Sequence, residues 1–278
     1  MANDDSRYVG AFFNSYTNTR MKLHRHCVPL EDDRDKIVKV YGYSPEEVDA
    51  VFAELDRDLE DAVTRVRETY GSRLDEKLKG REANFVFIGD QLTSEYLSYY
   101  NIIRKVCAPY DGIGVFIAGN TGDTSNQSVQ YVYGLAVSKA PLVTSILIGT
   151  NDIYKSGDVY GKTVSSREEY RQNVDYLVKV MLHNASKVIL HTLPPVNEEE
   201  AEAAYAHMNW RIENEEIDAR NEILRKIAEN NGCSLNDMAV QFKAFDRPVN
   251  LPGNGVLLTK EAQLYMAEKF LETLLEMI

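Results

Sequence analysis

Residues 84–94 read Asn-Phe-Val-Phe-Ile-Gly-Asp-Gln-Leu-Thr-Ser, a short apolar run that ends in Gly89 and Asp90. A continuous apolar run of this length is typical of a strand that helices cover on both faces. The Gly-Asp pair permits a sharp turn into a helix. Because open α/β sheets bind ligands at the carboxyl ends of their strands, this stretch predicts a strand that ends at a site.

Two later stretches repeat this pattern. Residues 114–118 form an apolar run that leads into Gly-Asn-Thr-Gly-Asp-Thr at 119–124. Residues 145–148 lead in the same way into Gly-Thr-Asn-Asp at 149–152. We therefore expect three strands to converge on one edge of a sheet.

Together the three strand ends resemble the SGNH/GDSL hydrolase superfamily, whose blocks are Gly-Asp-Ser, Ser-Gly-Asp-Thr, Gly-x-Asn-Asp and a final Asp-x-x-His. The first three blocks occur here in order, each after an apolar strand. The resemblance covers about residue 84 to the end. It implies an α/β fold, a three-layer α/β/α sandwich around a five-stranded parallel sheet, of the SGNH-hydrolase or flavodoxin-like kind.

The resemblance fails at the catalytic triad. The nucleophile position falls on Gln91, and the Asp and His of the last block fall on Asn254 and Leu257. The two oxyanion-hole donors carry over, as the backbone amide of Gly122 and the side-chain amide of Asn151. Losing nucleophile and base together costs on the order of a million-fold in rate, so ordinary serine hydrolysis is the first function we reject.

Three hypotheses remain. In the leading one, the chain is a pseudoenzyme whose neutral, amide-lined pocket at Gln91, Gly122, Asn151 and Asn254 binds a small carbonyl or acyl ligand. A carboxylate could also occupy the oxyanion hole, held by charge-assisted hydrogen bonds. A third hypothesis makes the chain an interaction subunit of an active paralogue.

The second hypothesis is an enzyme with rewired, non-serine acyl chemistry. The accessory groups available near the strand ends are Asp90, Thr93, Ser94, Asp123, Asp152 and His191. For each there is a structural alternative. Asp at such positions usually holds backbone turns, and a histidine at a strand end is usually satisfied by the backbone.

The composition of the chain argues against several classes of partner and of site. The chain has 278 residues with 43 acidic against 31 basic side chains, a formal charge of -12, which argues against nucleic acid or an anionic membrane as a partner. Its three cysteines are far apart and suggest neither a disulfide framework nor a zinc site. No apolar run approaches a membrane span. We expect a soluble, cytoplasmic protein with no cofactor and no metal.

Residues 1–80 read as an N-terminal helical extension, and 81–278 as the hydrolase-like domain. A capping box at Ser44 opens a helix whose apolar positions run in one stripe from Val48 to Tyr70. This stripe either docks on the chain's own sheet domain or forms a contact with a second copy or a paralogue. The basic cluster at residues 22–27 is interpreted as a polar surface or a contact between extension and domain.

The remaining elements follow from periodicity and capping signals. We expect helices over 92–106, 128–139, from Ser166 onward, and over 197–230, with Thr259 capping a final helix. The fourth and fifth strands are expected at 187–193 and 233–235.

Overall fold

A computed structural model of the protein describes residues 44–157 and 161–278, and its centre is a five-stranded parallel sheet. The strand order is β2-β1-β3-β6-β8, which places the first strand of the sequence pattern between the second and third. The strands are β1 Ala83–Gly89, β2 Ile113–Gly119, β3 Val143–Leu147, β6 Lys187–His191 and β8 Ser234–Asn236. The predicted fold class is confirmed.

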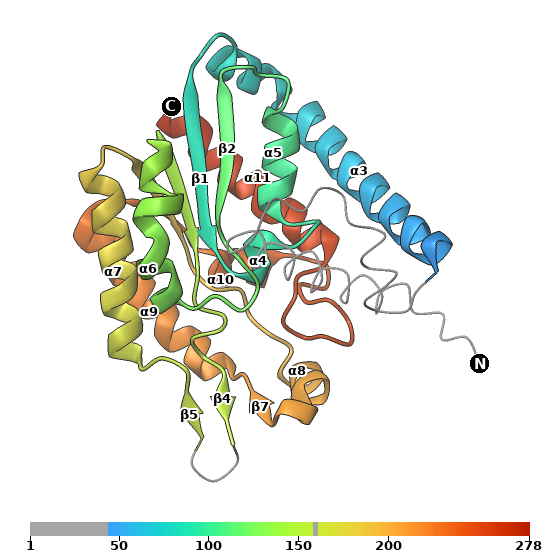
Figure 1. The fold of residues 1–278 in the computed structure, drawn as a ribbon, viewed down its shortest axis with the longest axis vertical. Coiled ribbons are helices and arrows are strands. Elements are labelled where there is room, and N and C mark those ends of the chain that lie inside the picture. The colour runs from blue at the N-terminus through green and yellow to red at the C-terminus, as the bar shows by residue number, and fades with distance from the viewer. Residues whose placement is uncertain (1–43, 158–160) are drawn as a thin grey trace.

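Helices cover both faces of this sheet (Figure 1). On one face lie α5 (Tyr99–Cys107) and α11 (Lys260–Met277), and α3 (Pro45–Leu78) packs against both of them. The opposite face is covered by α6 (Ser125–Leu135), α7 (Arg167–His183) and α9 (Asn214–Asn231). The result is the expected three-layer sandwich, with α3 outside one of the helical layers.

Helix α3 begins where the capping box predicts. Ser44 Oγ accepts from Glu47 N at 3.2 Å, and the Glu47 carboxylate accepts from Ser44 N at 2.8 Å. Its apolar stripe is buried, and from Leu59 through Val66 to Tyr70 it belongs to the chain's hydrophobic core, where α3 packs against α5 and α11. The predicted basic cluster at 22–27 lies outside the described residues.

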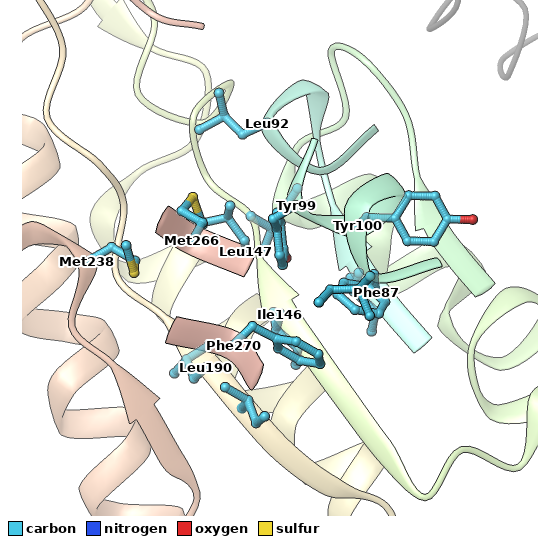
Figure 2. Close-up of a cluster of buried hydrophobic side chains, with 14 of the residues drawn as sticks. Phe87, Leu92, Tyr99, Tyr100, Ile146, Leu147, Leu190, Met238, Met266 and Phe270 are labelled. Carbon is cyan, nitrogen blue, oxygen red and sulfur yellow. The ribbon is translucent and has the colours of Figure 1, made fainter. Parts of the chain in front are cut away.

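A cluster of buried hydrophobic side chains packs around the strands of the sheet, as Figure 2 shows. Phe87 of β1 is fully buried, and its ring centroid lies 5.4 Å from those of Tyr99 and Tyr100 and 4.9 Å from that of Phe270. Aromatic pairs at such separations add to the stabilisation from apolar burial. These contacts fix α5 and α11 on the strand that leads to the site.

The prediction of one continuous helix over 92–106 is wrong. The chain forms α4 (Gln91–Ser94), breaks, and begins α5 at Tyr99 with Ser98 as N-cap. The break is stabilised from α11: Gln263 Oε1 accepts from Tyr99 N at 2.8 Å, and Gln263 Nε2 donates to Leu92 O at 2.9 Å. A side chain distant in sequence therefore satisfies backbone groups that a continuous helix would have paired.

The predicted helix over 197–230 is also interrupted. It forms α8 (Glu198–Tyr205) and α9, separated by a short strand, β7 (Trp210–Arg211). Asn209 takes a left-handed conformation with φ 51°, and β7 then pairs antiparallel with β4 (Lys155–Ser156). This pairing, together with β5 (Lys162–Thr163), makes a small second sheet that the sequence did not indicate.

Smaller differences concern element ends. Helix α6 begins at Ser125 rather than 128, β6 ends at His191 rather than 193, and the fifth strand is shifted by one residue. The remaining short elements are α10 Met238–Gln241, η1 Val137–Lys139, η2 Ala206–Met208 and η3 Phe242–Ala244. In the described part of the chain, no helix combines the length and apolar character needed to cross a membrane.

Gln263 generates a stability prediction. Gln263→Ala leaves Tyr99 N and Leu92 O without their buried partner, so we expect a loss of about 2 kcal/mol or more in the free energy of unfolding. Urea denaturation followed by circular dichroism measures it. Gln172→Ala, on an exposed face of α7, is the control and should change stability by less than about 0.5 kcal/mol. Equal effects of the two substitutions would contradict the role assigned to Gln263.

Candidate functional site

The ends of β1, β2 and β3 bring three sequence-predicted residues into direct contact. Gln91 is the first residue of α4, directly after β1. Its side-chain oxygen, Oε1, accepts from the backbone N–H of Gly122 at 3.2 Å and from Asn151 Nδ2 at 2.8 Å. These two donors are the ones that the resemblance assigns to the oxyanion hole. The oxygen of Gln91 therefore lies between the two groups to which the resemblance assigns that role.

The orientation of the Gln91 amide follows from these contacts. A flipped amide would turn its own N–H groups toward two other donors, which is repulsive. With Oε1 between these two donors, Nε2 faces away from them and makes no hydrogen bond to any described residue. Gln91 as a whole is 6% exposed. The amide nitrogen is thus the part of this buried side chain that the contact with Gly122 and Asn151 leaves unused.

The two donors are themselves held in place. Asn151 Nδ2 also donates to the backbone oxygen of Asp123 at 2.8 Å, which ties the loop after β3 to the loop after β2. Gly122 has φ 75°, a left-handed conformation that favours glycine. At the neighbouring strand end, a Cβ on Gly119 would overlap the carbonyl oxygen of Gly89. Close approach of the strands therefore depends on glycine at these ends.

Asp90 holds the strand ends together. Its Oδ1 accepts from Leu92 N at 3.0 Å and caps α4, and its Oδ2 accepts from Thr150 N at 3.1 Å. The side chain is fully buried, and burial raises the pKa of its carboxyl group to about 7. Both oxygens of Asp90 are engaged in fixing the backbone of two loops.

The other two predicted carboxylates have similar roles. Asp123 Oδ2 accepts from Asn120 N at 2.7 Å, within its own loop. Asp152 receives both the backbone N–H of Ser125 at 2.9 Å and its hydroxyl at 2.6 Å, at the beginning of α6. Burial raises the pKa of Asp152. These contacts are those expected of aspartates that stabilise turns.

Thr93 and Ser94 belong to α4 and are buried, with 0% and 4% of their surfaces exposed. A Cβ on Gly89 would overlap the Thr93 hydroxyl, so this hydroxyl packs directly on the end of β1. Both side chains are therefore buried beside Gln91, which is itself buried.

Asn254 and Leu257 lie in the loop before α11. Asn254 Oδ1 accepts from Val256 N at 3.1 Å and from Leu257 N at 2.8 Å, so the side chain holds its own turn. Its Nδ2 contacts Tyr205 Oη at 3.4 Å. Leu257 is buried in the apolar core. At the positions that the resemblance assigns to the acid and the base, Asn254 therefore stabilises its own turn and Leu257 packs in the core.

His191 lies at the end of β6 and is 1% exposed. Its Nε2 lies 2.9 Å from Ser145 Oγ, which in turn lies 3.1 Å from Tyr99 Oη. Its partner is thus a side chain rather than the backbone group expected from the sequence. Burial lowers the pKa of the imidazole to about 3, so His191 is neutral at ordinary pH.

Two buried charged groups near the site were missed from the sequence. Glu95 is 1% exposed, accepts a hydrogen bond from Gln263 Nε2, and has its pKa raised by burial to about 8. Arg220 is fully buried and donates to Ser165 O at 2.8 Å, beside the loop that carries Asp152. Their sequence surroundings are ordinary helix surface patterns, and only tertiary packing buries them.

Comparisons with known proteins identify the family and the fold. The family model described as GDSL-like lipase/acylhydrolase matches residues 42–270. The chain is similar to the lipase/acylhydrolase from Enterococcus faecalis, with 14% identity and TM-score 0.57 over 70% of this chain and 96% of that one. The acetyl xylan esterase AlAXEase gives 19% identity and TM-score 0.55 over 68% and 98%.

A catalytic mutant of Axe2, an acetylxylan esterase from Geobacillus stearothermophilus, gives 20% identity and TM-score 0.54 over 70% of this chain and 94% of that one. At these identities the likeness shows a shared fold. The comparison with curated proteins gives no match.

Glu95 generates a prediction on pH. In the unfolded chain a glutamate loses its proton near pH ~4.3, whereas folded Glu95 holds it up to about 8. Between these values the folded state binds more protons, so its stability falls as pH rises. Glu95→Gln retains an oxygen acceptor for Gln263 and cannot ionise. We expect urea unfolding at about pH 5 and about pH 8 to show a smaller difference in this variant.

The control is Glu276→Gln, which removes an exposed carboxylate of α11 and should leave the pH dependence of the wild type unchanged. The same fall in stability in wild type and Glu95→Gln would contradict the prediction.

Proposed function

Because the chain belongs to the GDSL-like lipase/acylhydrolase family, we propose that it is a non-hydrolytic member that binds a small acyl or carboxylate ligand at the former active site. The observation that carries the proposal is the position of Gln91 Oε1 between Gly122 N and Asn151 Nδ2. In hydrolases of this kind those donors stabilise the charge that develops on a substrate oxygen. Here a neutral oxygen of the protein takes that place.

The chemistry of the substituted positions supports the loss of hydrolysis. An amide nitrogen is not a nucleophile, and Leu257 cannot accept a proton. A hydrolase with an empty hole retains a residual rate from oxyanion stabilisation alone. Since the Gln91 oxygen fills the hole, a substrate carbonyl must displace it before even that contribution is available.

Rewired chemistry receives less support. A general base must reach the proton that it abstracts, whereas Asp90, Thr93 and His191 are each no more than 1% exposed. Asp123 and Asp152 use their oxygens on neighbouring backbone amides. These groups support the geometry of the site rather than a reaction at its surface.

The ligand class follows from the donors. Gln91 Nε2 offers an N–H group to a carbonyl or carboxylate oxygen, and rotation of the side chain would free two further donors on Gly122 and Asn151. The similar structures include esterases and a lipase/acylhydrolase by name, which favours an acyl group as the recognised part. The role as an interaction subunit of a paralogue stays a prediction.

We expect the purified protein neither to hydrolyse short-chain nitrophenyl esters nor to be labelled by fluorophosphonates, because no activated nucleophile lies at the site. The combined variant Gln91→Ser, Asn254→Asp, Leu257→His should gain activity over wild type, whereas each single change should do little, since triad members act as a unit. Ester hydrolysis by the wild type that Thr93→Val or Ser94→Ala abolishes would contradict the proposal and favour the rewired enzyme.

A second experiment tests the filled hole. In Gln91→Ala the donors of Gly122 and Asn151 lose an acceptor, so we expect the unliganded variant to be less stable by about 1–3 kcal/mol. Small carboxylates should raise its melting temperature more than that of the wild type, because each charge-assisted hydrogen bond contributes roughly 1.5–3 kcal/mol. A thermal-shift series with acetate, propionate and their methyl esters measures both effects.

The matched control adds Asn151→Ala to Gln91→Ala, which removes one donor and should weaken the carboxylate effect. Equal shifts in wild type, Gln91→Ala and the double variant would show that the carboxylates bind elsewhere. For the wild type, stabilisation that Asn151→Ala leaves unchanged would count against a ligand at this site.

A further inference from the structure

Three aromatic side chains gather beyond the carboxyl ends of the main sheet, where Figure 1 shows β4, β7 and α8. Tyr154 lies in the same loop as Asn151, Tyr205 ends α8, and Trp210 begins β7. The ring centroid of Tyr154 lies 5.6 Å from that of Tyr205 and 5.1 Å from that of Trp210. Tyr154 is buried, whereas the other two are half-buried and keep part of their surface for another group. We call these three residues the aromatic cluster.

The aromatic cluster adjoins the proposed ligand site on two sides. Tyr154 follows Asn151 by three residues, which is at most about 11 Å of chain. Burial, the neighbouring Tyr205 hydroxyl and Asp90 together raise the pKa of the Tyr154 hydroxyl, so Tyr154 lies within electrostatic range of the turn after β1. On the other side, the Tyr205 hydroxyl accepts from Asn254 Nδ2 at 3.4 Å. The cluster therefore connects the loop of Asn151 with the loop of Asn254.

The elements that carry the cluster are fixed to this loop and to each other. Asn197 N donates to Gly255 O at 2.9 Å, and Gly253 N donates to Glu200 Oε2 at 3.1 Å. These bonds tie the beginning of α8 to the loop that carries Asn254. Strand β7 is fixed by its pairing with β4. The rings are thus positioned before a ligand arrives, which lowers the cost of ordering them on binding.

The hydroxyl groups of Tyr154 and Tyr205 leave one donor unused. Asn254 Oδ1 accepts from the N–H groups of Val256 and Leu257, so the amide orientation is fixed and Nδ2 donates to Tyr205. A hydrogen bond between the two tyrosines uses only one of their two hydroxyl hydrogens. No residue in the described part of the chain accepts the other. Because Tyr205 is the more exposed of the two, its hydroxyl is the one that a ligand can reach.

We propose that the aromatic cluster receives the ring of an aryl carboxylate that carries an oxygen substituent, while the carboxylate lies at Gly122 and Asn151. This inference rests on the proposed function. The ring contacts Tyr205 and Trp210 in edge-to-face or offset geometry, and the ring quadrupole favours it over a saturated ring of the same size. The oxygen substituent accepts from the Tyr205 hydroxyl. One unused donor suits a ring with one acceptor better than a sugar, whose several hydroxyl groups each need a partner.

Titration of the full chain followed by tryptophan fluorescence tests the proposal, because Trp210 is the one tryptophan of the chain. The ligands are para-methoxybenzoate, benzoate, cyclohexanecarboxylate and acetate. We expect para-methoxybenzoate to change the fluorescence and to bind roughly fivefold tighter than benzoate. Benzoate should bind roughly threefold tighter than cyclohexanecarboxylate. Acetate, which has no ring, should leave the fluorescence unchanged.

A variant separates the hydroxyl from the ring. Tyr205→Phe removes the donor and keeps the aromatic surface, so it should weaken the binding of para-methoxybenzoate roughly fivefold and that of benzoate by less than about twofold. The matched control is Tyr133→Phe, which removes an exposed hydroxyl from α6 and should leave both affinities unchanged. Equal affinities for benzoate and cyclohexanecarboxylate, or an unchanged affinity for para-methoxybenzoate in Tyr205→Phe, would overturn the inference.

The variant Asn151→Ala distinguishes this failure from failure of the proposed function. If it abolishes the thermal stabilisation by acetate while the carboxylates with rings show no preference or no fluorescence change, the proposed function stands and the aromatic cluster is not its subsite. If Asn151→Ala alters the binding of no carboxylate, the proposed function fails, and the inference fails with it.

Discussion

The site depends on one oxygen atom, Gln91 Oε1, and its two donors. Gly122 and Asn151 lie 31 and 60 residues further along the chain, so the contact exists only because three parallel strands end at the same edge of the sheet. Strand β1 is hydrogen-bonded to both β2 and β3. Asp90 then fixes the turn that follows β1 to the loop after β3. The core beneath Phe87 supports the site because it fixes β1 between these neighbours.

Under the proposed function, Gln91 alone accounts for two properties of this site. A serine side chain at position 91 would be too short to place an oxygen between the two donors, whereas the longer glutamine side chain does so. Under the proposed function, the residue that stands in place of the nucleophile would therefore also fill the oxyanion hole. Asn254 and Leu257 complete the change, since one holds its own turn and the other packs in the core. In this proposal the site keeps the arrangement of the three strand ends, and the side chains of Asn254 and Leu257 have structural roles.

The sequence predicted those features that local signals determine. The strands follow from apolar runs, and the beginning of α3 follows from the capping box at Ser44. Prediction from the sequence failed where residues distant in the sequence determine the backbone conformation. Gln263 stabilises the break before Tyr99, and the strand β7 forms because it pairs with β4. The orientation of the Gln91 side chain likewise depends on residues that are distant in the sequence. Its position was predictable from the motif, but its occupancy of the hole depends on donors from two other loops.

Under the proposed function, the contacts that Gln91 makes with Gly122 and Asn151 also limit which ligands can bind. A ligand gains only the difference between its own hydrogen bonds and those that Gln91 already makes with Gly122 and Asn151. An ester carbonyl accepts hydrogen bonds more weakly than an amide oxygen, so a neutral ester has no advantage over the side chain that it would displace. A carboxylate forms stronger, charge-assisted bonds and can compete. Desolvation near the buried Asp90 opposes it. The chemistry of the acceptor, rather than the size of the acyl chain, therefore decides entry to the hole.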